Sequence, residues 1–342
     1  MTLELKNVGM IKEANVQIDG LTVIAGENDT GKSTVGKILY TIIKSSHMKT
    51  PINISMIKYN EFYNKNRFAL NVRFYLDNVF KDNIGNKNIY IQLNINDFDS
   101  FIVSLPSGLG GNDKKYTAPE KEIEKDIIFT ETPLIWNVSD FFRDIAQIES
   151  QYKIELDYPY LMKDLNFKLY IKSAFNGLDI KDRVISLMGG EFKRDEMGRY
   201  YFDKNGERIE LVNTATGIKQ FGLFQILSQN NYLNIDTILV LDEPEVHLHP
   251  KWQLEMAKII VELVKNGVKV LVNSHSPYMI EALKRYSEVE EIEDKTNFYL
   301  AEDGYIKQEN DSNSETLEKI FEKLSEPFDT FEEMDMERLI NG

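Results

Sequence analysis

Three short runs of apolar and β-branched residues stand out from the pattern of this chain. They cover residues 21–25, 237–241 and 268–272 and contain almost no polar side chains. Such continuous runs are typical of strands that are buried on both faces of a parallel sheet. Between residues 34 and 43, apolar residues instead recur every three or four positions, which predicts a helix. Buried strands combined with helices predict an α/β fold.

Weaker patterns predict the remaining elements. Strict alternation of apolar and polar residues favours half-buried strands, and a three- to four-residue spacing favours helices. Asn205 and Gly206 mark a tight turn. The segments expected as strands are 3–8, 14–18, 70–76, 89–95, 126–130 and a hairpin over 200–212, and those expected as helices lie within 139–192, 251–263 and 317–324.

The segment between the first apolar run and the following helix carries the clearest chemical signal. Residues 26–33 read G-x-x-x-x-G-K-S, the phosphate-binding P-loop, in the strand–loop–helix context that the motif requires. Lys32 is expected to reach the β- and γ-phosphates of a nucleotide, and the Ser33 hydroxyl to bind Mg²⁺. The residues expected to bind ATP here are Gly26, Asn28, Asp29, Thr30, Gly31, Lys32, Ser33 and Thr34.

The second apolar run ends in two carboxylates, Asp242 and Glu243. Open α/β sheets bind ligands at the carboxyl ends of their strands, so these acids are expected near the P-loop. In a P-loop fold, Asp242 is expected to hold Mg²⁺ directly or through water. Glu243 is then placed to polarise the attacking water.

Histidines follow both of the later apolar runs. His275 follows the third run, where it is expected to contact the γ-phosphate, although a lone histidine is often only a satisfied polar group. Glu245, His247 and His249 alternate after the second run. They could bind a metal ion, but their place before a helix favours a loop contact instead.

Composition and charge narrow the class of protein. The 342 residues include 42% hydrophobic residues and no cysteine, which predicts a globular protein without disulfides or thiolate metal sites. No signal peptide or membrane-length apolar run is evident, so we expect a soluble, cytoplasmic protein that does not use a membrane. Residues 285–342 contain 18 acidic and 6 basic residues and carry most of the net charge of −15. That acidity argues against non-specific nucleic-acid binding by this segment.

The order of these motifs resembles a known family. Residues 242–250 (Asp-Glu-Pro-Glu-Val-His-Leu-His-Pro) and 273–278 (Asn-Ser-His-Ser-Pro-Tyr) resemble ABC-type ATPases of the OLD, RecF and SMC-like group. The chain looks most similar to the small ATPases of bacterial anti-phage systems. The resemblance implies that Asp242 is the Walker B acid, Glu243 the catalytic glutamate and His275 the switch histidine, with Lys32 also catalytic. Residues 214–221 are the best match to the signature motif, with Thr in place of the usual Ser.

The resemblance also implies a mechanism. Two chains sandwich two ATP molecules with Mg²⁺, so Thr216 and Gly217 of one chain face the P-loop of the other. The expected protein is a nucleotide-switched homodimer or higher homo-oligomer that works with a separate effector, such as a nuclease or toxin, in anti-phage defence. Nucleic acid is a possible further partner. The alternatives are a DNA repair or end-binding ATPase of the RecF/SMC type and, with less support, the nucleotide-binding subunit of a transporter.

The same resemblance suggests how the chain is divided. Residues 1–44 and 210–309 are expected to form the ATPase core, 45–209 an inserted β-rich and helical lobe, and 310–342 an acidic C-terminal helical segment. Residues 130–133 are the best candidate for the Q-loop, although they contain no glutamine. The acidic segment is either a solvated appendage or an element that docks a partner.

Overall fold

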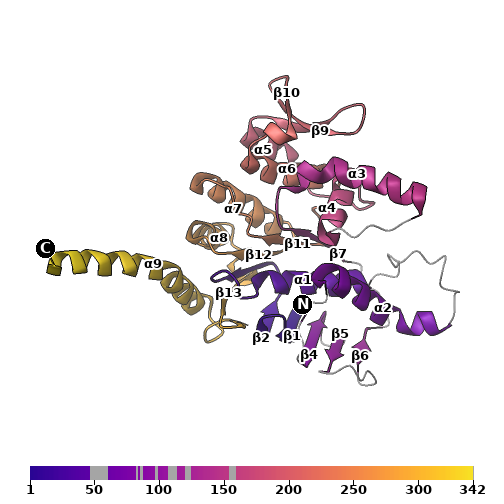
Figure 1. Ribbon diagram of the computed structural model, residues 1–342. Helices are drawn as coiled ribbons and strands as arrows, with labels where there is room; N and C mark the ends of the chain where they lie inside the picture. Colours follow the sequence, from indigo (N-terminus) through magenta and orange to yellow (C-terminus); the bar gives the residue numbers. More distant parts are fainter. Residues whose placement is uncertain are drawn as a thin grey trace.

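A large mixed sheet runs through the molecule, with helices packed on both faces (Figure 1). The computed structural model describes residues 1–46, 61–81, 84, 88–96, 99–106, 114–119, 125–153 and 159–341. Within these residues, the sheet has eleven strands. In spatial order they are β6 (Lys115–Thr117), β5 (Ser100–Leu105), β4 (Ile89–Asn94), β1 (Thr2–Val8), β2 (Ile11–Gln17), β14 (Tyr305–Lys307), β13 (Thr296–Glu302), β3 (Leu21–Ala25), β12 (Lys269–Ser274), β11 (Thr237–Asp242) and β7 (Asp126–Thr130).

The helices fill the connections between these strands. A small second sheet has the order β10 (Glu207–Glu210), β9 (Tyr200–Lys204), β8 (Glu191–Arg194). The helices are α1 (Lys32–Ser46), α2 (Glu61–Phe80), α3 (Ile135–Tyr152), α4 (Tyr160–Tyr170), α5 (Lys181–Met188), α6 (Thr216–Gln229), α7 (Pro250–Lys265), α8 (Pro277–Val289) and α9 (Asn313–Asn341). Short 3₁₀ turns cover Leu211–Asn213 and Glu293–Lys295.

The strand order places β12 between β3 and β11, although β12 follows both in the sequence. β7, β11, β12, β3 and β13 are all parallel to their neighbours in this list. Ser274 pairs with Ala25, and Asn273 pairs with Asp242, so the three strands end at the same level. Parallel strands with aligned carboxyl ends bring the residues that follow them to one edge of the sheet.

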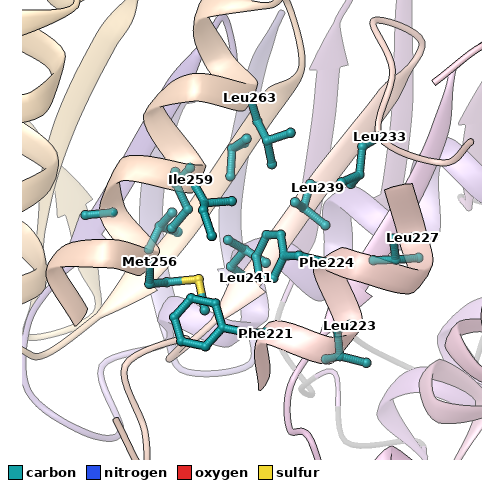
Figure 2. Close-up of a cluster of buried hydrophobic side chains, with 14 of the residues drawn as sticks. Phe221, Leu223, Phe224, Leu227, Leu233, Leu239, Leu241, Met256, Ile259 and Leu263 are labelled. Carbon is teal, nitrogen blue, oxygen red and sulfur yellow. The ribbon is translucent and has the colours of Figure 1, made fainter. Parts of the chain in front are cut away.

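Side chains of the central strands alternate between two hydrophobic cores. In β3, Val23 faces the core that contains α6, α7 and α8, whereas Ile24 faces the core that contains α1. In β11, Leu239 and Leu241 face the first core and Val240 faces the second. Figure 2 shows side chains of α6 and α7 closing over those of β11. Burial on both faces explains why these strands are apolar throughout.

Helix α1 lies against the sheet at Gly36. A β-carbon at this position would lie 2.6 Å from Val240 Cγ1 and 2.9 Å from Phe129 Cε2, both closer than van der Waals contact. Glycine therefore permits the close approach of α1 to β11 and β7. The P-loop directly precedes α1, so this close packing helps to position the loop relative to the carboxyl ends of the strands.

Most of the elements predicted from the pattern are confirmed. The three apolar runs form β3, β11 and β12, and alternating residues form β1, β2 and β4. The expected hairpin is β9–β10, where Asn205 has φ 55° and Gly206 has φ 84°. Positive φ at both central residues is the geometry of a type I′ turn, for which Asn-Gly is preferred. Gly189 ends α5 in the left-handed conformation, at φ 65°.

The prediction of a strand over residues 70–76 is wrong, because these residues belong to α2. The buried apolar positions are Val72, Tyr75 and Leu76, which are separated by three and four residues and lie on one face of a helix. Phe74 lies between these buried positions and is itself apolar, because it is partly buried and packs against the same core. Apolar residues at 72, 74 and 76 therefore imitate the alternation of a strand. A seven-residue window was too short to separate the two periods.

The segment expected as an inserted lobe shares the main sheet with the expected core. β4, β5 and β6 extend the sheet beyond β1, and β7 pairs with β11. The division into core, lobe and C-terminal segment stays a prediction. The expected C-terminal helix is α9, which continues past position 327 and extends away from the sheet (Figure 1). Across the described residues, no helix is long and apolar enough to cross a membrane.

The close contact at Gly36 gives a stability prediction. Gly36→Val should lower the free energy of unfolding by about 1–3 kcal/mol, because the added atoms must displace Val240 and Phe129 in a packed core. Denaturant unfolding monitored by circular dichroism measures this change. The control Glu288→Val places the same side chain at an exposed position of α8 and should change stability by less than ~1 kcal/mol. Equal stability of Gly36→Val and wild type would contradict the packing described here.

Candidate nucleotide site

The P-loop lies between β3 and α1 and requires glycine at its first and sixth positions. Gly26 has φ 151° and Gly31 has φ 93°, conformations that residues with side chains rarely adopt. A β-carbon would lie 2.3 Å from the Ala301 carbonyl oxygen at Gly26, and 2.7 Å from Ile11 Cγ1 at Gly31. The loop therefore folds tightly over β13 and β2, with the N-terminus of α1 at its end. Backbone N–H groups at such a helix N-terminus form an anion site.

Lys32 is buried under this loop, with 4% of its surface exposed. Its Nζ donates hydrogen bonds to the carbonyl oxygens of Gly26 at 3.0 Å and Glu27 at 2.5 Å. Burial lowers the pKa of Lys32, and the nearby acids Glu243 and Asp242 oppose this effect. The ammonium group is thus fixed within the loop, close to the acidic end of β11.

Asp242 is held at the end of β11 by two donors from neighbouring elements. Its Oδ1 accepts a hydrogen bond from the Ser33 hydroxyl at 3.0 Å and one from Asn273 Nδ2 at 2.7 Å. Burial raises the pKa of Asp242, while these hydrogen bonds oppose the shift. Asn273 Oδ1 is buried and has no hydrogen-bond partner within the described part of the chain. A carboxylate, a hydroxyl and an amide oxygen are hard donors, so this group of residues fits Mg²⁺.

Glu243 and His275 lie next to this group. Glu243 has φ 52°, a left-handed conformation that is costly for a residue with a side chain and that is found preferentially at functional sites. Its backbone N–H donates to the Asn273 carbonyl at 2.9 Å, which fixes this conformation. His275 Nδ1 lies 3.4 Å from Glu243 Oε1. The structure therefore places Glu243 and His275 as an adjacent acid–imidazole pair.

The P-loop and Glu243 together line a cavity of about 290 Å³. Residues 28–34 supply most of its wall, and Met10 supplies another part from the turn between β1 and β2. Met10 is 51% exposed, and no sequence motif pointed to it. A larger cleft of about 880 Å³ lies elsewhere, between α5, β8 and the end of α6, and it contains none of the predicted site residues. Proximity to the P-loop chemistry makes the smaller cavity the candidate site.

The Q-loop candidate lies at the same edge of the sheet. The Thr130 hydroxyl donates to the Val240 carbonyl at 3.2 Å, which ties the end of β7 to β11. Glu131 pairs with Lys37 of α1, at 3.2 Å between Oε1 and Nζ. The negative charge of Glu131 also helps to raise the pKa of Asp242. Glu131 therefore occupies a position from which it can influence the acidic end of β11.

Thr216 and Gly217 begin α6 and are not among the residues that line the P-loop cavity. A β-carbon at Gly217 would lie 3.2 Å from Leu248 Cδ2 and 3.7 Å from Trp252 Cε3. The start of α6 therefore packs against the segment that follows Glu243. Within the described residues of one chain, the signature candidate therefore lies outside the P-loop cavity.

The three alternating residues after β11 have separate roles in the structure. Glu245 accepts a hydrogen bond from the Ser274 hydroxyl at 2.7 Å. His249 caps α7 by accepting the Lys251 backbone N–H at 3.3 Å, whereas His247 lies at an exposed turn with φ 64°. Among the described residues, no three His, Cys, Asp or Glu side chains are arranged to hold a metal ion.

Comparisons with known proteins match an ATPase family over part of the chain. Residues 112–280 match the family described as AAA ATPase domain. No curated protein matches the chain.

An Smc head bound to the C-winged helix domain of ScpA is 13% identical, with 90% of this chain and 95% of that chain covered and a TM-score of 0.47. The SMC head domain from Thermotoga maritima is 15% identical, with coverages of 89% and 96% and a TM-score of 0.44. An ATP-binding cassette of an ABC transporter in its ADP conformation is 15% identical, with 96% of each chain covered and a TM-score of 0.37.

The strand order and the P-loop between β3 and α1 agree with the α/β fold of a P-loop NTPase that the sequence predicts. A mixed central sheet carries helices on both faces, and the acidic end of β11 lies beside the P-loop. Asn273 was not predicted as a site residue, although the motif around His275 contains it. Its role depends on the register of β12 against β11, which a sequence does not reveal.

The buried charge of Asp242 gives a pH-dependent prediction. The pKa of Asp242 is raised above its ordinary value of 3.8, so the folded state loses stability as pH rises through this raised pKa. Without nucleotide, Asp242→Asn should therefore melt at a higher temperature than wild type at neutral pH. Below the ordinary pKa the difference should vanish, because the wild-type carboxyl is then protonated in both states.

Thermal melts of both proteins between acidic and neutral pH measure this difference. The control Asp19→Asn removes an exposed carboxylate that pairs with Lys269 at 3.3 Å, so it should gain no stability at neutral pH. A melting temperature of Asp242→Asn at or below that of wild type at neutral pH would show that the carboxylate stabilises the fold.

Proposed function

We propose that this protein binds ATP with Mg²⁺ at the P-loop and hydrolyses it. The observation that carries the proposal is the meeting of Lys32, Ser33, Asp242 and Glu243 at one edge of the sheet, around the P-loop cavity. Lys32 and the N-terminus of α1 would neutralise the phosphates. Ser33 and Asp242 would hold Mg²⁺, which supplies charge neutralisation between the β- and γ-phosphates.

Glu243 and His275 supply the groups for hydrolysis in this proposal. Glu243 lines the cavity next to the P-loop, where its carboxylate can accept a proton from an attacking water. His275 Nδ1, 3.4 Å from Glu243 Oε1, orients that carboxylate. Asp242 already accepts hydrogen bonds from Ser33 and Asn273. Glu243 is therefore the acid that we assign to accept the proton of the attacking water.

The signature candidate supports a site that is completed by a second chain. Thr216 and Gly217 lie at the N-terminus of a 14-residue helix, where backbone N–H groups favour phosphate. They do not line the P-loop cavity of their own chain. We propose that they contact ATP bound to the P-loop of a partner copy, so that ATP closes a homodimer and hydrolysis opens it.

We propose further that the dimer switches a separate effector, such as a nuclease or toxin, in anti-phage defence. The support is the resemblance of residues 242–250 and 273–278 to the small ATPases of such systems. Affinity capture from the native host, combined with phage challenge, tests this role. Loss of protection in Glu243→Gln together with a captured nuclease or toxin would support it. Salt-dependent DNA binding without such a partner would instead favour a RecF/SMC-type role.

Removal of the P-loop lysine tests ATP binding. Lys32→Ala should weaken ATP binding by at least about 100-fold, because the main cation facing the phosphates is lost. The fold should survive, since burial already disfavours the charged lysine. Titration with a fluorescent ATP analogue measures binding. The control Lys12→Ala, whose ammonium lies over the Tyr305 ring, should bind like wild type. Unchanged binding by Lys32→Ala would contradict the assignment of the site.

Substitution of Glu243 separates binding from hydrolysis. Glu243→Gln should bind ATP like wild type but hydrolyse it at least about 100-fold more slowly, because the amide cannot accept the proton of the water. The ATP-dependent dimer should consequently persist, which light scattering after gel filtration measures. Hydrolysis at the wild-type rate would remove Glu243 from the mechanism, and a variant that stays monomeric at saturating ATP would contradict the switch.

A further inference from the structure

Glu245 is a buried carboxylate at the centre of the loop that follows β11. Only 4% of the residue is exposed. Its Oε1 accepts two hydrogen bonds, from the Ser274 hydroxyl at 2.7 Å and from the His275 backbone N–H at 3.0 Å. Its Oε2 is buried and has no hydrogen-bond partner within the described part of the chain. The same Oε1 lies 3.7 Å from His275 Nδ1.

Such a residue is unfavourable for stability alone. A buried carboxylate with one unsatisfied oxygen loses more hydration than two hydrogen bonds restore, and burial raises the pKa of Glu245. The Ser274 hydroxyl and the backbone could be satisfied by a neutral side chain. A costly carboxylate beside a candidate catalytic group is typical of a functional site.

The Glu245 carboxylate contacts both the backbone and the imidazole of His275. Glu245 Oε1 accepts a hydrogen bond from the His275 backbone N–H, and this bond fixes the backbone position from which the imidazole extends at the end of β12. The imidazole Nδ1 then lies between the two acids, 3.4 Å from Glu243 Oε1 and 3.7 Å from Glu245 Oε1. Ser274 is fully buried and ties the same carboxylate to the last residue of β12. Glu245 thus joins the loop after β11 to the end of β12.

We propose that Glu245 is a positioning residue for hydrolysis: it fixes the backbone and imidazole of His275 so that His275 orients the Glu243 carboxylate. This inference rests on the proposed ATPase function. Glu245 does not line the P-loop cavity, and its carboxylate is hydrogen-bonded to the backbone of His275, through which we expect it to act on Glu243. Hydrolysis should therefore depend on Glu245 while ATP binding does not.

The kinetic test compares two substitutions of Glu245 alone and with His275→Ala. Glu245→Ala should lower kcat about 10- to 100-fold with KM changed less than about threefold, because only the geometry of the reacting groups is lost. Glu245→Gln keeps an oxygen that can accept both hydrogen bonds and should recover most of the wild-type kcat. In the His275→Ala background, Glu245→Ala should change kcat less than about twofold, since both act through one group.

A second readout does not require activity. The chain contains four histidines, so labelling them with ¹³C and ¹⁵N gives few NMR signals, and His275→Ala assigns the signal of His275. Glu245→Ala should shift the His275 imidazole resonances, whereas Glu245→Gln should shift them much less. Thermal melts exclude general unfolding as the cause.

The outcomes separate the two proposals. If wild type hydrolyses ATP but Glu245→Ala keeps its kcat, or lowers kcat equally with and without His275, the positioning role is wrong. If wild type lacks ATPase activity but the His275 resonances still shift in Glu245→Ala and recover in Glu245→Gln, the positioning of His275 stands and the proposed function fails. Unchanged resonances in Glu245→Ala would overturn the inference whatever the activity.

Discussion

The hydrogen-bonded placement of β12 between β3 and β11 is the constraint on which the site depends. β12 pairs with both strands in parallel, so the residues after all three strands meet at one edge. Asn273 can then hold Asp242, and Ser274 and His275 can hold Glu245. A slip of one residue in this register would turn these side chains to the opposite face of the sheet.

The edge of the sheet concentrates groups that folding alone would not favour. Asp242 and Glu245 are buried acids whose pKa values are raised by burial, and Lys32 is a buried base whose pKa is lowered by burial. Glu243 adds a left-handed backbone conformation at φ 52°. Hydrophobic cores on both faces of the sheet hold these groups in place. Proteins commonly place such unfavourable groups where chemistry requires them.

Strong local signals made the central part of the fold predictable. The P-loop, the acids after β11 and His275 each follow a short apolar run, and parallel strands bring such ends together. The helix over 70–76 was missed because its buried face coincided with an alternating pattern. The extension of the sheet by β4, β5 and β6 was also unforeseen, because pairing between distant strands leaves no local trace. Asn273 and Met10 were not predicted either, because their contacts with Asp242 and with the P-loop cavity join residues far apart in the sequence.

The proposed dimer requires that a second chain completes each nucleotide site. Thr216 lies at the N-terminus of α6, where glutamate suits the helix dipole but would repel a triphosphate. A Lys32→Ala chain has a defective P-loop and an intact signature motif. A Thr216→Glu chain has an intact P-loop and a defective signature motif. The control Val212→Glu places the same charge at a nearby position that is 77% exposed.

The most direct measurement is the ATPase rate of an equimolar mixture of Lys32→Ala and Thr216→Glu chains. If each site is formed by two chains, mixed dimers contain one doubly defective and one intact site, so about a quarter of all sites are intact. The mixture should then hydrolyse ATP well above the sum of the two separate variants. A mixture that is no more active than that sum, while Val212→Glu remains fully active, would contradict a site shared between chains.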